Sequence, residues 1–171
     1  LRSVGAVQDI TREKLVEDRL RVAAVAFETH EAIMITDAFD NSIRVNQAFE
    51  ETTGYRAEEV LGKNPSILNS GRQDKAFYAA MWRQLLNIGS WSGEIWDRRK
   101  DGQIYPKWLT ITAVRNESGE TTGYVGIFND ISERKKTEEK LLVLQKELEA
   151  LSFKDGLTRI ANRRRFDEIL P

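Results

Sequence analysis

The stretch WSGEIWDRRKDGQIYPKWLTITAVRNESGETTGYVGIF, residues 91–128, decides the fold of this chain. Apolar and polar residues alternate in it along three runs, at 91–99, 104–114 and 122–128. Alternation of period two is typical of strands with one buried face. The runs are separated by Lys100-Asp101-Gly102 and by the segment 116–119 (NESG), both of which have the composition of hairpin turns. The stretch therefore predicts three consecutive antiparallel strands.

The segment before this stretch predicts two more strands and several short helices. Residues 33–35 and 43–45 are short apolar runs on either side of a turn-rich segment. Asn46 and Asp74 each stand at the start of a helical pattern, where their side chains can cap free backbone amides. Two strands, several small helices and then three strands predict an α+β fold: one five-stranded antiparallel sheet with small helices on one face.

Helices are expected on both sides of this domain. Residues 11–29 read as a linker helix with an apolar stripe. A second helix, over 132–152, follows Asp130, whose carboxylate would cap it and interact favourably with its dipole. Four leucines of this helix recur at the spacing of a coiled-coil seam: Leu141, Leu144, Leu148 and Leu151. The two stripes together predict a homodimer through coiled-coil signalling helices.

A short sequence repeat indicates tandem domains. VGAVQDI at residues 4–10 resembles VGIFNDI at residues 125–131. A repeat with a domain-sized period predicts tandem copies of one unit. Residues 1–10 are therefore expected to be the tail of a preceding copy, and residues 30–131 one complete copy. The chain is expected to be a piece of a longer modular protein.

Composition excludes several classes of function. The chain has 40% hydrophobic and 31% charged residues with a net charge of −1, so no basic field exists to gather nucleic acid. Its apolar runs are too short to span a bilayer, so we expect no direct membrane contact and a cytoplasmic location, with an upstream anchor left open. Without cysteine and with a single histidine, the sequence offers no catalytic nucleophile–base pair and no thiolate metal site. We expect no enzyme activity.

Four motifs point to a known family. NQAFEETTGY (46–55), EEVLGKNP (58–65), GEIWDRRKDG (93–102) and GIFNDIS (126–132) resemble, in order and spacing, those of the PAS domain, a sensory module of bacterial signalling proteins. The resemblance implies that residues 30–131 form the PAS fold. It also implies a pocket between the sheet and the small helices, which in this family holds haem, flavin, a metabolite or only side chains.

The end of the chain resembles a different module. FKDGLT (153–158) and NRRRF (162–166) are similar to the start of a GGDEF domain, the diguanylate cyclase module, although Arg159 replaces the usual glycine. The resemblance implies a regulatory fragment of a cyclic-di-GMP signalling protein, with adjacent PAS and GGDEF domains as its partners. The signal would pass through the hinge Asp130-Ile131-Ser132. Whether an EAL phosphodiesterase domain follows stays open.

A flavin is the best cofactor candidate from the resemblance. The segment 91–102 is similar to the strand of flavin-binding PAS redox sensors that carries an asparagine for the ring edge and a tryptophan for the ring face. Asp97 and Trp91 take these places here, and Asn64 and Ile95 complete the candidate FAD site. Asp97 can accept a hydrogen bond but, when ionised, cannot donate one, and its burial requires a partner or a proton.

Other readings of the pocket remain open. Haem is disfavoured because His30, the one histidine, precedes the first strand. A cysteinyl-flavin photocycle is excluded because Pro65 stands where light sensors of the superfamily carry cysteine. Strand alternation places Trp91 and Trp96 on opposite faces, so both cannot point inward. Side chains alone could fill the pocket, and the alternative function is a cofactor-free dimerisation spacer with no sensing role.

Overall fold

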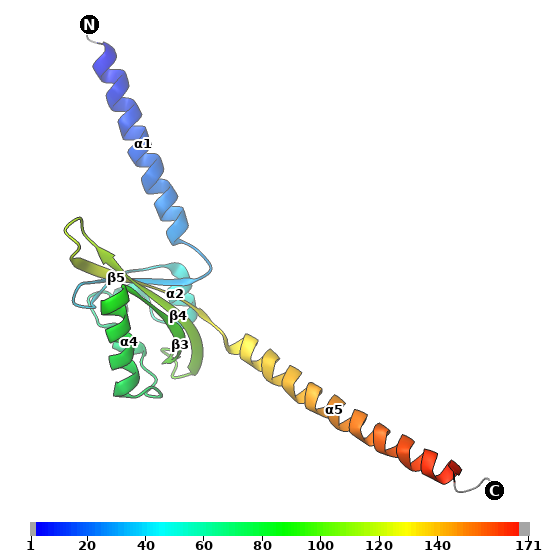
Figure 1. The fold of residues 1–171 in the computed structure, drawn as a ribbon. Coiled ribbons are helices and arrows are strands. Elements are labelled where there is room, and N and C mark those ends of the chain that lie inside the picture. The colour runs from blue at the N-terminus through cyan, green and yellow to red at the C-terminus, as the bar shows by residue number, and fades with distance from the viewer. Residues whose placement is uncertain (1–2, 168–171) are drawn as a thin grey trace. The chain divides into compact units, whose positions relative to one another are not determined.

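The computed structural model of the protein describes the backbone of residues 3–167 and the side chains of residues 12–151. The chain divides into two units, with the boundary between Ile131 and Ser132. The first unit contains the helix α1 (Ser3–Phe27) and the whole sheet domain, and the second is the helix α5 (Ser132–Asp167) (Figure 1).

A single sheet organises the first unit. Its strands are β1 (Ala32–Asp37), β2 (Ser42–Val45), β3 (Ser90–Arg98), β4 (Ile104–Arg115) and β5 (Thr121–Asp130). Their order in the sheet is β2-β1-β5-β4-β3, and all neighbours are antiparallel. The predicted α+β fold with a five-stranded antiparallel sheet is confirmed. The long strands β3, β4 and β5 correspond to the three runs of alternating residues.

Four short helical segments follow β2 in the chain: α2 (Gln47–Thr53), α3 (Ala57–Val60), the 3-10 helix η1 (Pro65–Leu68) and α4 (Lys75–Ile88). The Asp74 carboxylate caps α4 by accepting from the Phe77 amide at 2.8 Å, as predicted. Buried side chains of α2, α4 and η1, such as Phe49, Leu85 and Leu68, form one core with the inner face of the sheet. The site described below lies in this layer.

Asn46 ties three elements together. Its side chain is almost fully buried, and its oxygen accepts from the amides of Ile33 at 2.9 Å and Phe49 at 3.0 Å. Its amide nitrogen donates to the carbonyls of Phe27 at 3.0 Å and Glu31 at 2.9 Å. One side chain thus caps α2 as predicted and also joins the end of α1 to β1.

The helix expected at 11–29 spans Ser3–Phe27. Residues 3–10, the expected tail of a preceding domain, therefore have helical backbone in this structure. A strand at the end of a domain forms by pairing with the other strands of its own sheet, so this helical backbone does not decide whether residues 3–10 end such a domain. The repeat and the domain boundaries built on it stay predictions. Phe27 is buried at the end of α1, with the Arg44 guanidinium 4.0 Å from its ring centroid.

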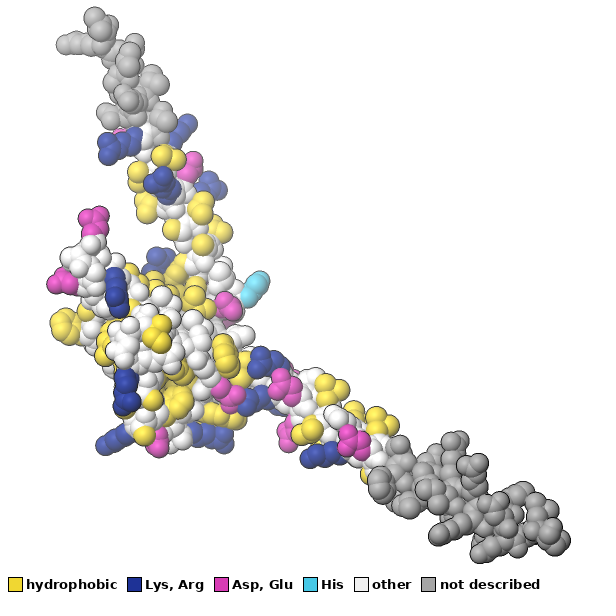
Figure 2. All heavy atoms as spheres, in the orientation of Figure 1, with side chains coloured by type: hydrophobic (Ala, Val, Ile, Leu, Met, Phe, Trp, Pro, Cys, Tyr) yellow, Lys and Arg dark blue, Asp and Glu magenta, His cyan; other side chains and the backbone are white. Residues whose placement is uncertain are grey.

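The helix α5 includes the expected signalling helix 132–152 and continues to Asp167. The four seam leucines are all more than half exposed, as are Leu15, Val16 and Leu20 of α1. Figure 2 shows hydrophobic side chains interleaved with charged ones along both helices.

The side chains of residues 153–171, the expected start of a GGDEF domain, lie outside the described residues. In the part of the chain that the structure describes, no helix has the length and apolarity to cross a membrane.

Candidate functional site

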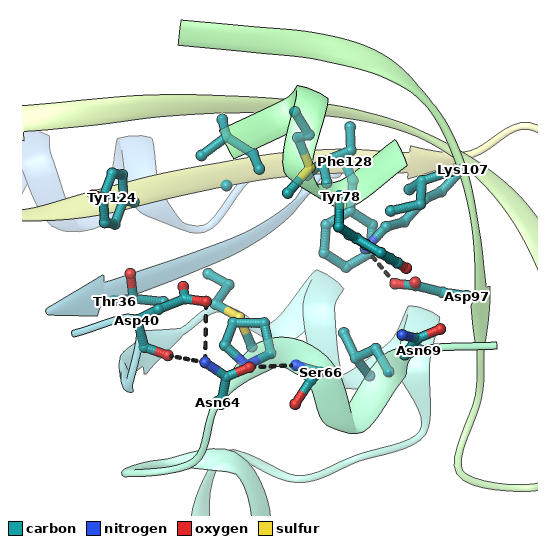
Figure 3. Close-up of a pocket in the computed structure, with 18 of the residues that line it drawn as sticks. Thr36, Asp40, Asn64, Ser66, Asn69, Tyr78, Asp97, Lys107, Tyr124 and Phe128 are labelled. Carbon is teal, nitrogen blue, oxygen red and sulfur yellow. Dashed lines mark hydrogen bonds and ion pairs between the residues drawn. The ribbon is translucent and has the colours of Figure 1, made fainter. Parts of the chain in front are cut away.

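A cavity of about 360 Å³ lies between the inner face of the sheet and the small helices. This volume is within the range of small-molecule sites, and such sites are mostly apolar with a few placed polar groups. The walls follow this pattern and include Met34, Met81, Trp82, Ile95, Leu109 and Tyr124. The floor at Gly126, on β5, has no side chain. Figure 3 shows polar groups gathered in two places on this lining.

The first polar group is a buried ion pair. The Lys107 ammonium pairs with the Asp97 carboxylate, and each residue is only 4% exposed. The same ammonium lies 3.9 Å from the centroid of the Phe128 ring. Burial raises the pKa of Asp97, while the charge of Lys107 and its hydrogen bond oppose that rise. Tyr78 lines the cavity beside this pair, and burial and the Asp97 charge raise the pKa of its phenol (Figure 3).

The second polar group joins the β1–β2 turn to η1. Asn64 caps η1 by accepting from the Ser66 amide at 2.9 Å, and its amide nitrogen donates to the backbone and carboxylate oxygens of Asp40, both at 3.1 Å. Asp40 has a φ of 62°, in the left-handed region. Burial raises its pKa, and the Asn64 hydrogen bond opposes that rise. The buried Thr36 hydroxyl faces Asp40 without a hydrogen bond of normal geometry to any described residue.

Three of the four predicted cofactor residues come together. Asn64, Ile95 and Asp97 line the cavity. Trp91 points inward and Trp96 does not, as the alternation predicted, but Trp91 is not among the residues that line the cavity. Its ring packs edge-on against Phe77, with centroids 6.0 Å apart. The tryptophan on the cavity wall is Trp82, and a cofactor role for any of these residues stays a prediction.

Sequence reasoning missed Lys107, the partner that a buried Asp97 requires. Lys107 stands between Tyr105 and Leu109 on the inward-facing alternation of β4, and all three are buried. A charged residue at an inward position of a strand was the available signal, because an unpaired ammonium there is costly. The side chains of residues 12–151 include no group of three or more acidic or histidine residues placed to hold a metal ion.

The predicted hinge follows directly on the sheet. Asp130 is the last residue of β5 and Ser132 the first of α5. The Asp130 carboxylate pairs with the Arg99 guanidinium. The buried Ile131 donates its N–H to the Pro106 carbonyl of β4 at 3.1 Å. Asp130 thus holds β5 to the β3–β4 connection, and its predicted role as the cap of α5 stays a prediction.

Comparisons with known proteins agree on the domain. The nitrogen fixation regulatory protein of Klebsiella oxytoca is 37% identical over 110 residues, which are 64% of this chain and 22% of that protein. The chain thus spans about a fifth of that relative's length. A PAS domain structure from Colwellia psychrerythraea has a TM-score of 0.63 at 28% identity, covering 67% of this chain and 98% of that one.

A structure of an RNA-binding Light-Oxygen-Voltage receptor has the same TM-score, 0.63, at 30% identity, and covers 73% of this chain and 36% of that one. The family model described as a PAS domain matches residues 30–133, more than half of the chain. This range contains the five strands, the small helices and the cavity. The chain belongs to the PAS domain family.

Proposed function

We propose that this chain is the sensory module of a multidomain regulator, that its cavity holds a flavin-type ligand, and that α5 carries the signal to a diguanylate cyclase domain. The observation that carries the proposal is the cavity of about 360 Å³ whose apolar walls enclose a buried carboxylate–ammonium pair. Lys107 of this pair stands directly opposite Asp130 in the β4–β5 ladder. A change at the ligand would therefore act close to the end of the sheet.

The lining fits the edge of an isoalloxazine ring. Such an edge presents an N–H donor beside carbonyl acceptors, and an asparagine would satisfy both with its amide. Here the Asp97 carboxylate can supply the acceptor, and the Tyr78 hydroxyl beside it on the cavity lining can supply the donor, so two side chains together provide what a single amide would provide. Trp82 and Ile95 offer apolar contact for the ring, and Gly126 leaves space for it. A bound flavin would supply the redox chemistry itself.

Absorption spectroscopy tests the ligand. Protein purified from a flavin-rich host, or incubated with FAD and passed over a desalting column, is expected to show bands near about 375 and 450 nm. Gly126→Val would place methyl groups in the cavity and should abolish the bands. Thr110→Val, whose side chain lies on the exposed face of β4, is the matched control. A parent protein without bands under both conditions refutes the flavin proposal.

The output side of the proposal rests on sequence. The resemblance of residues 153–171 to the start of a GGDEF domain supports a link to cyclic-di-GMP, in a cytoplasmic part of the parent protein. The exposed leucines of α5 and the apolar residues of α1 support a homodimer, because an exposed stripe of this kind gains stability by pairing. Fusion of the complete cyclase domain and measurement of its product with and without bound flavin would test this link.

The alternative is a cofactor-free dimerisation spacer. One observation favours it: Asp97 and Lys107 already neutralise each other, so the cavity needs no ligand to satisfy its buried charges. The spacer predicts a dimer whose spectrum shows only protein absorption and whose fused cyclase has constant output. A flavin spectrum would rule the spacer out.

A further inference from the structure

Five side chains lie along the sheet between the cavity and Ile131, and they form the junction cluster: Asp97, Arg99, Tyr105, Lys107 and Asp130. The cluster contains two ion pairs, one between Asp97 and Lys107 and one between Arg99 and Asp130. The first pair lines the cavity, and the second lies at the last residue of β5. The cluster thus connects the proposed ligand site to the strand end that precedes α5.

Tyr105 stands between the two pairs. It is the register partner of Asp97 across β3 and β4, and the Arg99 guanidinium lies 4.0 Å from its ring centroid. Its hydroxyl is buried and has no hydrogen-bond partner among the described residues. Burial, and then the charge of Asp97, raise the pKa of this phenol. An orphaned buried hydroxyl is costly, so the observed pairing does not satisfy every polar group of the cluster.

Lys107 has a second carboxylate within its reach. In the β4–β5 ladder Lys107 stands directly opposite Asp130. In the β3–β4 ladder it stands opposite Ile95, and Asp97, two residues further along β3, is its diagonal neighbour. Directly opposite side chains have Cβ atoms about 4.5–5.5 Å apart, and diagonal ones about 7–8 Å. A lysine has a long, flexible stem, so the ammonium can serve either carboxylate.

We propose that Lys107 is a switch with two partners: a ligand that engages the Asp97 carboxylate releases the Lys107 ammonium to Asp130, where it displaces Arg99. The inference rests on the proposed sensory function, because a ligand must compete for Asp97. The cluster then has two discrete arrangements, and both the ligand and the strand end bias the same equilibrium. The change reaches Asp130 and the neighbouring Ile131 amide across one pair of strands.

Hydrogen exchange measured by NMR on the ligand-free 171-residue chain tests the switch. Asp97→Asn removes the charge that holds Lys107, so exchange of the Ile131 amide, bonded to Pro106, should become about tenfold faster relative to the Phe49 amide in the core. Asp97→Asn combined with Lys107→Met should return to the parental ratio, because no ammonium remains to move. An unchanged ratio in the first variant, or a ratio in the second as high as in the first, overturns the switch.

A second variant covers the case in which Asp97→Asn fails to fold. Arg99→Met leaves Asp130 without its guanidinium, so Lys107 should leave the Phe128 ring for Asp130 and shift the ring proton resonances of Phe128. Unshifted resonances overturn the switch. Because no ligand is added, the expected pattern in a protein that retains no flavin supports the switch and refutes only the flavin proposal. A protein that binds flavin but lacks the pattern refutes the switch alone.

Discussion

Breaking the buried pair of Asp97 and Lys107 should destabilise the domain far more than removing it. At a separation of about 3 Å and an effective dielectric constant of about 20, the attraction between the charges is about 5 kcal/mol. Transfer of each ion out of water costs several kcal/mol, so the intact pair contributes little net stability. Removing Lys107 leaves the Asp97 carboxylate buried at 4% exposure without its ammonium, whereas removing Asp97 leaves Lys107 able to turn to Asp130. We expect Lys107→Met alone to lower the free energy of unfolding by about 3–5 kcal/mol, and Asp97→Leu alone to lower it by less.

The free energy of unfolding of the double variant Asp97→Leu/Lys107→Met should lie within about 1 kcal/mol of the parent value or above it, because two apolar side chains then fill the same space. Urea unfolding followed by circular dichroism gives all four free energies of the cycle. Lys100→Met, which removes the exposed partner of Glu59, is the matched control and should have little effect. A Lys107→Met variant that costs under about 1 kcal/mol, or a double variant whose cost equals the sum of the two single costs, would refute the reasoning.

Three further predictions concern the floor of the cavity, the pH dependence and the assembly. Gly123→Ala should lower the free energy of unfolding by about 1–3 kcal/mol because its Cβ would overlap the Thr36 carbonyl oxygen, whereas Gly126→Ala, with its nearest neighbours at 3.7 and 3.8 Å, should be close to neutral in urea unfolding. Because the pKa of Asp97 is raised in the folded protein, the native state holds this proton up to a higher pH than the unfolded chain does. As the pH falls from the raised pKa toward the usual value of 3.8, the free energy of unfolding of the parent should therefore rise relative to that of Asp97→Leu/Lys107→Met. At neutral pH this difference between the two proteins should be constant. Leu144→Asp together with Leu148→Asp should convert the proposed homodimer to monomer in sedimentation experiments, and an unchanged profile would exclude the α5 seam.

The strands and helix caps were predictable because each depends on neighbours in sequence. Alternation located β3, β4 and β5, and the capping roles of Asn46 and Asp74 follow from side-chain chemistry that acts within three residues. The same alternation placed Ile95 and Asp97 on the cavity side of β3. Local pattern was therefore enough for the sheet and for the side to which its residues point.

The details of the site depend on contacts between distant segments, which a pattern along one strand does not contain. Trp91 and Trp82 are both large aromatics at half-buried or buried positions, and only the packing of α4 on β3 decides which of them reaches the cavity. Lys107 and Asp97 lie on different strands, and their pairing depends on the β3–β4 register. The ion pair of Asp130 with Arg99 depends likewise on where the β3–β4 connection returns.

The four hydrogen bonds of Asn46 have a mechanical consequence for domains arranged in series. Its two donor hydrogens and both oxygen lone pairs are in use, so the side chain has no free capacity with which to follow a rotation of α1. A rotation of α1 must therefore either break one of these buried hydrogen bonds or move β1 and α2 as well. If another domain precedes α1 in the parent protein, a movement of that helix would therefore reach β1 and α2 through the side chain of Asn46.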